Sequence, residues 1–269
     1  MRGSRAGEDT AVTIHETAIV DGSAELGTGV EIGPFAIVGP GVSIGANTRI
    51  GPRVLIEKDT TVGRDCLIAN GAVLGTDPQD LKYEGERTFL EVGDRTVIRE
   101  FATLNRGTGT AGSTVVGSDC LLMAYCHIAH DCALGNHIIV SNATNMAGQV
   151  TIEDWAIISG LVAIHQFVRI GAHAFVGGGS RIPQDVPPYC RAVGNPSPRL
   201  YGLNTVGLER RGFPADVRRR LKRVYRILFQ SNLNLSRAIA RVEADQTLLD
   251  PEVGYFIDFI RTSKRGITT

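Results

Sequence analysis

The stretch from Val30 to Val54 reads VEIGPFAIVGPGVSIGANTRIGPRV, and it decides the fold. An aliphatic residue recurs at every sixth position and is followed each time by glycine, as in Ile32-Gly33. An α-helix would space its apolar residues three and four positions apart. A period of six with glycine is typical of a parallel β-helix, in which each repeat forms one short strand and a turn, and three repeats complete a coil of about 18 residues.

The six-residue period extends over most of the chain. The aliphatic residues in phase are Ile14, Val20, Leu26, Ile32, Val38, Ile44, Ile50, Ile56, Val62, Ile68, Leu74, Val92, Ile98, Leu104, Val116, Leu122, Ile128, Leu134, Val140, Met146, Ile152, Ile158, Ile164, Ile170, Val176 and Ile182. The six-residue phase is interrupted near residues 76–91 and 109–114. In a β-helix such insertions form loops outside the coils, often on the binding face. We therefore predict a β-helix domain over residues 11–190 with two loop insertions.

The C-terminal part has a helical pattern instead. Apolar residues fall at helical spacing over residues 217–229, and Pro214 suits the first turn of that helix. Further helices are expected near residues 235–244 and from Asp250 to Gly266. The predicted fold class is therefore mainly β: a β-helix followed by a small α-helical domain over residues 207–269.

The charge of this tail leaves two interpretations open. Residues 207–269 hold 13 Lys and Arg against 7 Asp and Glu, and several of the arginines cluster on the first helix. The cluster is either a solvated helix face or a dock for an acidic partner.

Composition restricts the classes of function. The formal net charge is zero, so bulk charge predicts no nucleic-acid or membrane partner. No apolar stretch is long enough to span a bilayer, and residues 1–10 lack the apolar core of a signal peptide. The five cysteines are an odd, scattered set and a poor disulfide framework. We therefore expect a cytoplasmic protein without a transmembrane segment.

Three cysteines are candidate metal ligands because of their regular spacing. Cys120, Cys126 and Cys132 are six positions apart, where other repeats carry a small or β-branched residue. Their spacing favours buried small hydrophobic residues over metal ligands.

Histidines supply the strongest chemical signal. His127 and His130 flank one aliphatic anchor, and His165 follows another about two coils later. His130 and His165 should therefore lie near one edge, roughly 10 Å apart. An imidazole is the usual general base for a sugar hydroxyl, and Asp131 could fix its tautomer. Ordinary surface histidines are the alternative.

The stretch Gln79-Asp80-Leu81-Lys82-Tyr83 mixes acid, base and aromatic residues inside the first insertion, and loops of that kind often carry function. The run Gly177-Gly178-Gly179 lacks the strand–loop–helix context of a phosphate loop. Close packing at a coil edge, or room for a ligand, explains it better.

Six motifs together are more specific than a generic β-helix. They are Gln79–Tyr83, Gly93-Asp94-Arg95 with Ile98-Arg99-Glu100, His127–Cys132, His165-Gln166-Phe167, Gln184–Tyr189 and Gly207–Phe213. In this order they closely resemble the acyl-carrier-protein–UDP-N-acetylglucosamine O-acyltransferases, which catalyse the first step of lipid A biosynthesis. The resemblance covers nearly the whole chain. It implies a left-handed β-helix, a homotrimer with active sites between neighbouring prisms, and no metal or organic cofactor.

The resemblance also implies a mechanism. His130 would be the general base, with Asp131 as its partner, for the glucosamine 3-hydroxyl. The resulting oxygen would attack the thioester of a (R)-3-hydroxyacyl chain on acyl carrier protein. The backbone N–H of Gly148 matches the oxyanion position. The basic tail would suit acidic acyl carrier protein.

The family's substrate positions carry over residue by residue. Those expected to contact substrate are Gln79, Asp80, Lys82, His127, His165 and Gln166. Asn204, Arg210 and Arg211 match the residues that hold the nucleotide, and the two arginines suit a diphosphate. Gly178 stands where a larger side chain would shorten the acyl pocket, so we expect long acyl chains.

Three positions depart from the family pattern. Gln149 and Asn105 stand where many members have histidine, and Pro196 follows Gly194-Asn195 where commoner members differ. These changes leave open whether the acceptor carries a 3-hydroxyl or a 3-amino group. The alternatives are a related N-acyltransferase, a coenzyme A-dependent acetyltransferase, a trimeric β-helix carbonic anhydrase with three histidines on zinc, and a noncatalytic solenoid.

Overall fold

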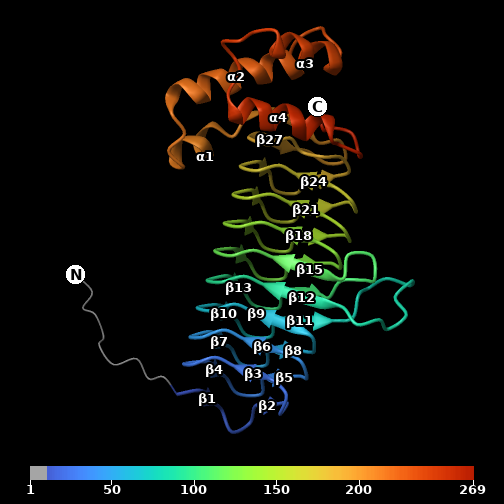
Figure 1. The fold of residues 1–269 in the computed structure, drawn as a ribbon. Coiled ribbons are helices and arrows are strands. Elements are labelled where there is room, and N and C mark those ends of the chain that lie inside the picture. The colour runs from blue at the N-terminus through green and yellow to red at the C-terminus, as the bar shows by residue number, and fades with distance from the viewer. Residues whose placement is uncertain (1–10) are drawn as a thin grey trace, which may run out of the picture.

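The chain is an elongated prism of stacked coils, closed at its C-terminal end by a small group of helices (Figure 1). The structure is a computed structural model that describes residues 11–269. The polar segment 1–10, in which no signal-peptide core was expected, lies outside the described residues.

Short strands stack into three sheets, one for each side of the prism. Sheet A contains β1 (Thr13–Ile14), β4 (Glu31–Ile32), β7 (Arg49–Ile50), β10 (Leu67–Ile68), β13 (Val97–Ile98), β16 (Leu121–Leu122), β19 (Ile139–Val140), β22 (Ile157–Ile158), β25 (Phe175–Val176), β27 (Cys190–Val193) and β28 (Arg199–Leu203). Sheet B contains β2 (Ile19–Val20), β5 (Ile37–Val38), β8 (Leu55–Ile56), β11 (Val73–Thr76), β14 (Thr103–Asn105), β17 (His127–Ile128), β20 (Asn145–Met146), β23 (Ala163–Ile164) and β26 (Arg181–Ile182). Sheet C contains β3 (Glu25–Leu26), β6 (Ser43–Ile44), β9 (Thr60–Val62), β12 (Phe89–Val92), β15 (Ser113–Val116), β18 (Ala133–Leu134), β21 (Thr151–Ile152) and β24 (Arg169–Ile170).

The register follows the repeat. Ile32 pairs with Ile50, which pairs with Ile68, and the strands are parallel except for β28, which runs antiparallel to β27. The turns that join the sheets form three edges of the prism, called here the A–B, B–C and C–A corners. A residue therefore lies above the equivalent residue one coil earlier.

The in-phase aliphatic residues form the core. From Ile32 to Ile182 each of them is at most 3% exposed, whereas Ile14 in the first coil is 45% exposed because no described coil lies beneath it. Burial of each such side chain stabilises the fold by about 1.5–3 kcal/mol.

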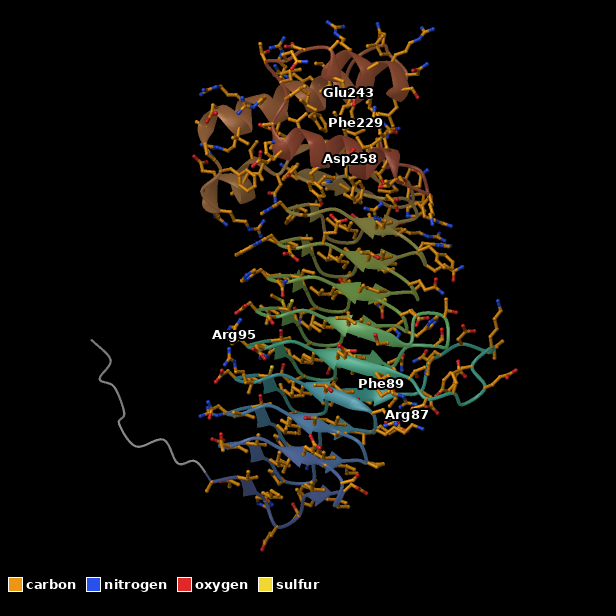
Figure 2. All side chains as sticks on the ribbon, in the orientation of Figure 1. Arg87, Phe89, Arg95, Phe229, Glu243 and Asp258 are labelled. Atoms are coloured by element: carbon orange, nitrogen blue, oxygen red, sulfur yellow. The ribbon has the colours of Figure 1, made fainter. Side chains whose placement is uncertain are left out.

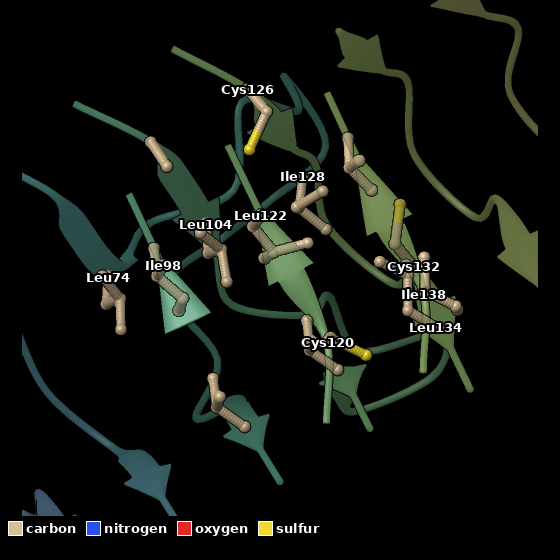
Figure 3. Packing of buried hydrophobic residues seen from close by; sticks show 14 of the residues in the cluster. Leu74, Ile98, Leu104, Cys120, Leu122, Cys126, Ile128, Cys132, Leu134 and Ile138 are labelled. Atoms are coloured by element: carbon tan, nitrogen blue, oxygen red, sulfur yellow. The ribbon is translucent and has the colours of Figure 1, made fainter. Parts of the chain in front are cut away.

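The second inward position of the repeat holds smaller residues, and the cysteines occupy it. Cys120, Cys126 and Cys132 lie among the core leucines and isoleucines (Figure 3). Burial raises the pKa of the Cys120 thiol to about 11 and those of Cys126 and Cys132 to about 12. The prediction of buried small hydrophobic residues is confirmed.

The C-terminal helices have a core of their own, built on residues such as Leu221 and Phe256. The helices are α1 (Thr205–Arg210), α2 (Ala215–Phe229), α3 (Leu235–Glu243) and α4 (Pro251–Arg261). No helix among residues 11–269 is both long and apolar enough to cross a membrane.

The end of α4 differs from the expectation. The sequence placed it at Gly266, but α4 ends at Arg261 because the following residues turn back onto the β-helix. Ser263 donates to the Asp185 carboxylate at 2.7 Å, and Asp185 also pairs with Ile267 through the backbone. The helix α1 and the strand β28 were not predicted either.

Candidate functional site

Both insertions leave the prism at the B–C corner. The first joins β11 to β12 and projects from the side of the prism (Figure 1), and the second joins β14 to β15. The turn that carries His130 and Asp131 joins β17 to β18 at the same corner. The loops therefore lie beside the histidine that the sequence singled out.

The Asp131 carboxylate is buried and fully engaged. Its Oδ1 accepts the Thr108 backbone N–H at 2.7 Å, and its Oδ2 accepts the Thr108 hydroxyl at 2.6 Å. His130 Nδ1 lies 2.9 Å from the same Oδ2, and the Asp131 side chain is 0% exposed. Thr108 belongs to the second insertion, so this loop fixes the partner of the histidine.

This geometry defines the tautomer of His130. A carboxylate only accepts hydrogen bonds, so Nδ1 carries the hydrogen and Nε2 keeps its lone pair. The imidazole is 14% exposed. A basic nitrogen therefore faces an accessible surface, as a general base requires.

Gly148 lies one coil above His130. A Cβ built on Gly148 would come within 2.5 Å of His130 Nε2 and 2.4 Å of Cε1, so only glycine leaves room for the imidazole here. Gly148 occupies the first turn position, where Pro34 and Pro52 stand in other coils. Proline fits there because the position needs no backbone hydrogen bond. Within residues 11–269 the Gly148 N–H likewise has no acceptor, and it remains available beside His130.

His127 is the second histidine at this corner. Its Nδ1 lies 2.7 Å from the Thr103 hydroxyl one coil below. Burial lowers the pKa of His127, and the nearby His130 adds to the effect. His127 is therefore a neutral hydrogen-bonding group rather than a cation at neutral pH.

The first insertion is anchored by a buried arginine. Arg106 is 0% exposed and donates to the Gly75 carbonyl, to the Asp77 carboxylate, and to the Tyr83 hydroxyl at 3.2 Å. Asn105 donates to the Asp77 carbonyl at 2.9 Å. These contacts hold the base of the loop.

At the tip of the first insertion, the Asp80 carboxylate accepts the Lys82 backbone N–H at 3.0 Å. The side chains of Gln79 and Lys82 are exposed. The returning limb is fixed where Arg87 lies beside Phe89 (Figure 2), with the guanidinium 5.4 Å from the ring centroid.

The two insertions also touch. The Glu86 carboxylate in the first accepts the Gly109 N–H of the second at 2.9 Å. The loop that carries Asp80 and the loop that holds Asp131 therefore form one unit.

Two coils above His130, the same corner carries Gln166, with His165 next to it. Both are exposed. The C-terminal tail reaches this point: Arg265 Nη2 lies 3.1 Å from His165 Nδ1 and donates to the Pro183 carbonyl at 3.1 Å. The expectation that His130 and His165 share an edge agrees with the strand register.

Asn204, Arg210 and Arg211 lie at another corner. They line a cavity of about 490 Å³ between α1 and the face of sheet A, together with Phe175 and Arg191. Asn204 is 6% exposed, caps α1 through the Gly207 N–H at 3.2 Å, and donates to the His173 carbonyl at 3.0 Å. This is the C–A corner, so one chain does not bring these residues to His130.

Gly178 lies at the third corner, A–B. A Cβ there would meet the Gly160 carbonyl at 3.3 Å. Along the same corner, large apolar side chains are exposed: Phe35 (57%), Phe101 (45%), Tyr125 (61%) and Leu161 (72%).

Sequence reasoning missed several residues that support the site. Thr108 and Arg106 act through insertion contacts that no repeat pattern contains, although the break in phase marks the segments. Arg265 and Trp155 were also missed, and both touch predicted site residues. Within residues 11–269, no group of three or more His, Cys, Asp or Glu is placed to hold a metal ion.

Residues 185–268 match the family described as Udp N-acetylglucosamine O-acyltransferase, domain 2, and residues 41–76 match the bacterial transferase hexapeptide family. An acyl-[acyl-carrier-protein]–UDP-N-acetylglucosamine O-acyltransferase of Stenotrophomonas maltophilia is 48% identical over 96% of this chain and 98% of its own length. A protein of the same name from Anaeromyxobacter dehalogenans is 52% identical over 96% of this chain and 100% of its own.

Solved structures agree. A UDP-N-acetylglucosamine acyltransferase of Bacteroides fragilis superposes with a TM-score of 0.93 at 43% identity, covering 96% of this chain and 100% of that chain. That of Francisella novicida gives 0.90 at 37% identity, covering 95% and 94%. The predicted fold class, a left-handed parallel β-helix with a small C-terminal helical domain, is confirmed. The chain is an acyltransferase and belongs to the acyl-[acyl-carrier-protein]–UDP-N-acetylglucosamine O-acyltransferase family.

Proposed function

We propose that this enzyme transfers a (R)-3-hydroxyacyl chain from acyl carrier protein to the 3-hydroxyl of UDP-N-acetylglucosamine, the first step of lipid A biosynthesis. The names of its relatives support the two substrates. The observation that carries the proposal is the His130–Asp131–Thr108 chain of hydrogen bonds, beside which the Gly148 N–H has no acceptor among residues 11–269.

The reaction follows from this arrangement. His130 Nε2 takes the proton of the sugar hydroxyl as the oxygen attacks the thioester carbon. Asp131 stabilises the imidazolium through Nδ1, and the Gly148 N–H donates to the tetrahedral oxyanion. The intermediate then collapses, the carbon–sulfur bond breaks, and His130 returns the proton to the thiolate of the carrier.

The remaining residues bind and orient the substrates in the proposal. Gln79, Asp80, Lys82, His127, His165 and Gln166 contact substrate along the B–C corner. Asn204, Arg210 and Arg211 hold the nucleotide, because two guanidinium groups beside a cavity suit a diphosphate.

We also propose that the active form is a homotrimer in the cytoplasm. His130 and Arg211 lie at different corners of one prism, so a site that needs both requires a neighbouring copy. The exposed apolar side chains at the A–B corner, Phe101, Tyr125 and Leu161 among them, form the kind of surface that a chain covers by association. The basic tail suits acidic acyl carrier protein.

The test is acyl transfer by the purified enzyme from 3-hydroxyacyl carrier proteins of several lengths. UDP-N-acetylglucosamine is the first acceptor, and its 3-amino analogue and coenzyme A thioesters form parallel arms. Turnover with carrier-bound donor and the 3-hydroxyl acceptor is expected. Activity restricted to the 3-amino acceptor or to coenzyme A donors would contradict the proposal.

A further inference from the structure

The C–A corner carries a column of stacked rings. His137 and Trp155 have centroids 3.8 Å apart at 15°, and Trp155 and His173 have centroids 6.3 Å apart at 3°. Trp155 is the single tryptophan of the sequence and is half-buried. The rings lie above one another because each occupies the second turn position of successive coils.

Arg211 packs against this column. Its guanidinium carbon lies 5.1 Å from the Trp155 ring centroid, and Nη1 lies 3.4 Å from His173 Nδ1. Indole is the ring that attracts a guanidinium most strongly. Arg211 also lines the 490 Å³ cavity. The residue therefore contacts the ring column and the cavity at the same time.

His173 is suited to hold the arginine. Burial and the adjacent Arg211 lower the pKa of His173 to about 4, so the ring is neutral at neutral pH and Nδ1 can accept from Arg211. Phe213 packs on the ring edge-on at 4.9 Å. The backbone carbonyl of His173 accepts from Asn204, so one residue contacts two members of the candidate nucleotide site.

Arg210 provides the contrast. It lines the same cavity but is exposed, and its side chain makes no hydrogen bond or ion pair with residues 11–269. A side chain that is already ordered loses less conformational entropy on binding than a free one.

We propose that Trp155 is a positioning residue, whose indole face orients the Arg211 guanidinium toward the cavity to receive the diphosphate of the nucleotide sugar. The proposal rests on the proposed function and adds a residue outside the substrate contacts. It also makes Trp155 a built-in reporter of nucleotide binding.

The first experiment is a titration of the full-length enzyme with UDP, followed by tryptophan fluorescence and, in parallel, by calorimetry. A diphosphate bound by the Arg211 guanidinium changes the charge next to the indole, so a saturable change in emission is expected at the calorimetric Kd. Arg211→Ala should abolish this change. Calorimetric binding without any emission change would overturn the reporter role of Trp155.

The second experiment separates positioning from structure. Trp155→Leu removes the ring face, and we expect KM for the nucleotide sugar to rise about 3- to 10-fold with kcat nearly unchanged. Trp155→Phe keeps a ring and should recover most of the loss. His137→Leu is the matched control, because it removes the other ring on Trp155 without touching Arg211, and KM should stay at the wild-type value.

The outcomes also separate this proposal from the proposed function. Equal UDP affinity in wild type and Trp155→Leu would overturn the positioning role and leave the acyl transfer intact. Absence of UDP binding to the wild type would overturn both. If Trp155→Leu does not fold by circular dichroism, Trp155→Met takes its place as the variant without a ring, and a UDP affinity equal to that of the wild type would contradict the proposal.

Discussion

Asp131 fixes the chemistry of its neighbour through its charge. As an acceptor-only group it holds the hydrogen of His130 on Nδ1, and Thr108 satisfies its other oxygen. Asparagine has nearly the same shape, but its NH₂ group would donate to Nδ1 and move the hydrogen to Nε2.

We therefore predict that Asp131→Asn lowers kcat about 10²-fold or more while KM and melting temperature change little. Steady-state kinetics and thermal unfolding measure this. Asp119→Asn is the control, because that carboxylate pairs with Arg95 at the C–A corner. Wild-type kcat in Asp131→Asn would rule out the tautomer argument.

Position 148 requires glycine, because a larger side chain would overlap the His130 imidazole. Gly148→Ala places a methyl group about where the His130 imidazole lies, so we predict a loss of kcat of about 10²-fold or more. Gly22→Ala is the matched control, since it occupies the equivalent turn position at the same corner and its Cβ meets nothing within 4 Å. Equal activity of the two variants would show that the tight approach has no consequence.

Protonation of the His173 side chain affects the free energy of unfolding at acidic pH. Its folded pKa, about 4, lies below its ordinary value of 6.5, so the unfolded chain takes up the proton first as the pH falls. This group therefore lowers stability progressively from about pH 6.5 toward pH 4. His173→Phe keeps the ring and removes the titration, so its melting temperature should fall less than that of wild type over this range. Parallel melting curves would contradict the assignment.

At the scale of elements, the first insertion depends on one buried side chain. Arg106→Leu removes the donor to Gly75, Asp77 and Tyr83 at once and should free the loop that carries Asp80. We predict a KM for the nucleotide sugar raised about 10-fold, and proteolytic cleavage within residues 77–88. Glu84→Ala is the control, since the Glu84 side chain is exposed in the same loop and its removal leaves the Arg106 contacts in place. An uncleaved loop in Arg106→Leu would contradict the anchoring role.

The strands were predictable because the six residues of each repeat are enough to define its strand. A six-residue period places one aliphatic residue inward per strand, as at Ile98 and Ile158, and nothing distant is needed. The end of α4 was not predictable, because its stop at Arg261 depends on Asp185 in the β-helix. The start of α1 also depends on a distant contact, because its capping residue Asn204 donates to the His173 carbonyl at the C–A corner.

At the scale of the molecule, the three corners carry different chemistry. His130 was predictable from its spacing and from the resemblance, and its partner follows it directly. The buried hydrogen bond that supports Asp131 was not predictable, because its donor Thr108 lies in a loop outside the repeat, where the six-residue period does not place residues. The separation of Arg211 from His130 also depends on the path of the chain after residue 190.

This separation predicts complementation between chains. His130→Ala and Arg211→Ala should each be nearly inactive, but chains mixed, unfolded and refolded together should regain activity, because statistical assembly leaves about one shared site in four intact. The measurement is the specific activity of the mixture against each variant refolded alone. Activity no higher than the mean of the two parents would show that each site lies within one chain.

The most direct test of the central claim is acyl transfer from 3-hydroxyacyl carrier protein to UDP-N-acetylglucosamine by wild type and His130→Ala, each confirmed as folded. We predict wild-type turnover and a fall in kcat of about 10²-fold or more in the variant, within the range of general base catalysis. Turnover by His130→Ala close to that of wild type would contradict the account, because His130 is the residue assigned as the general base.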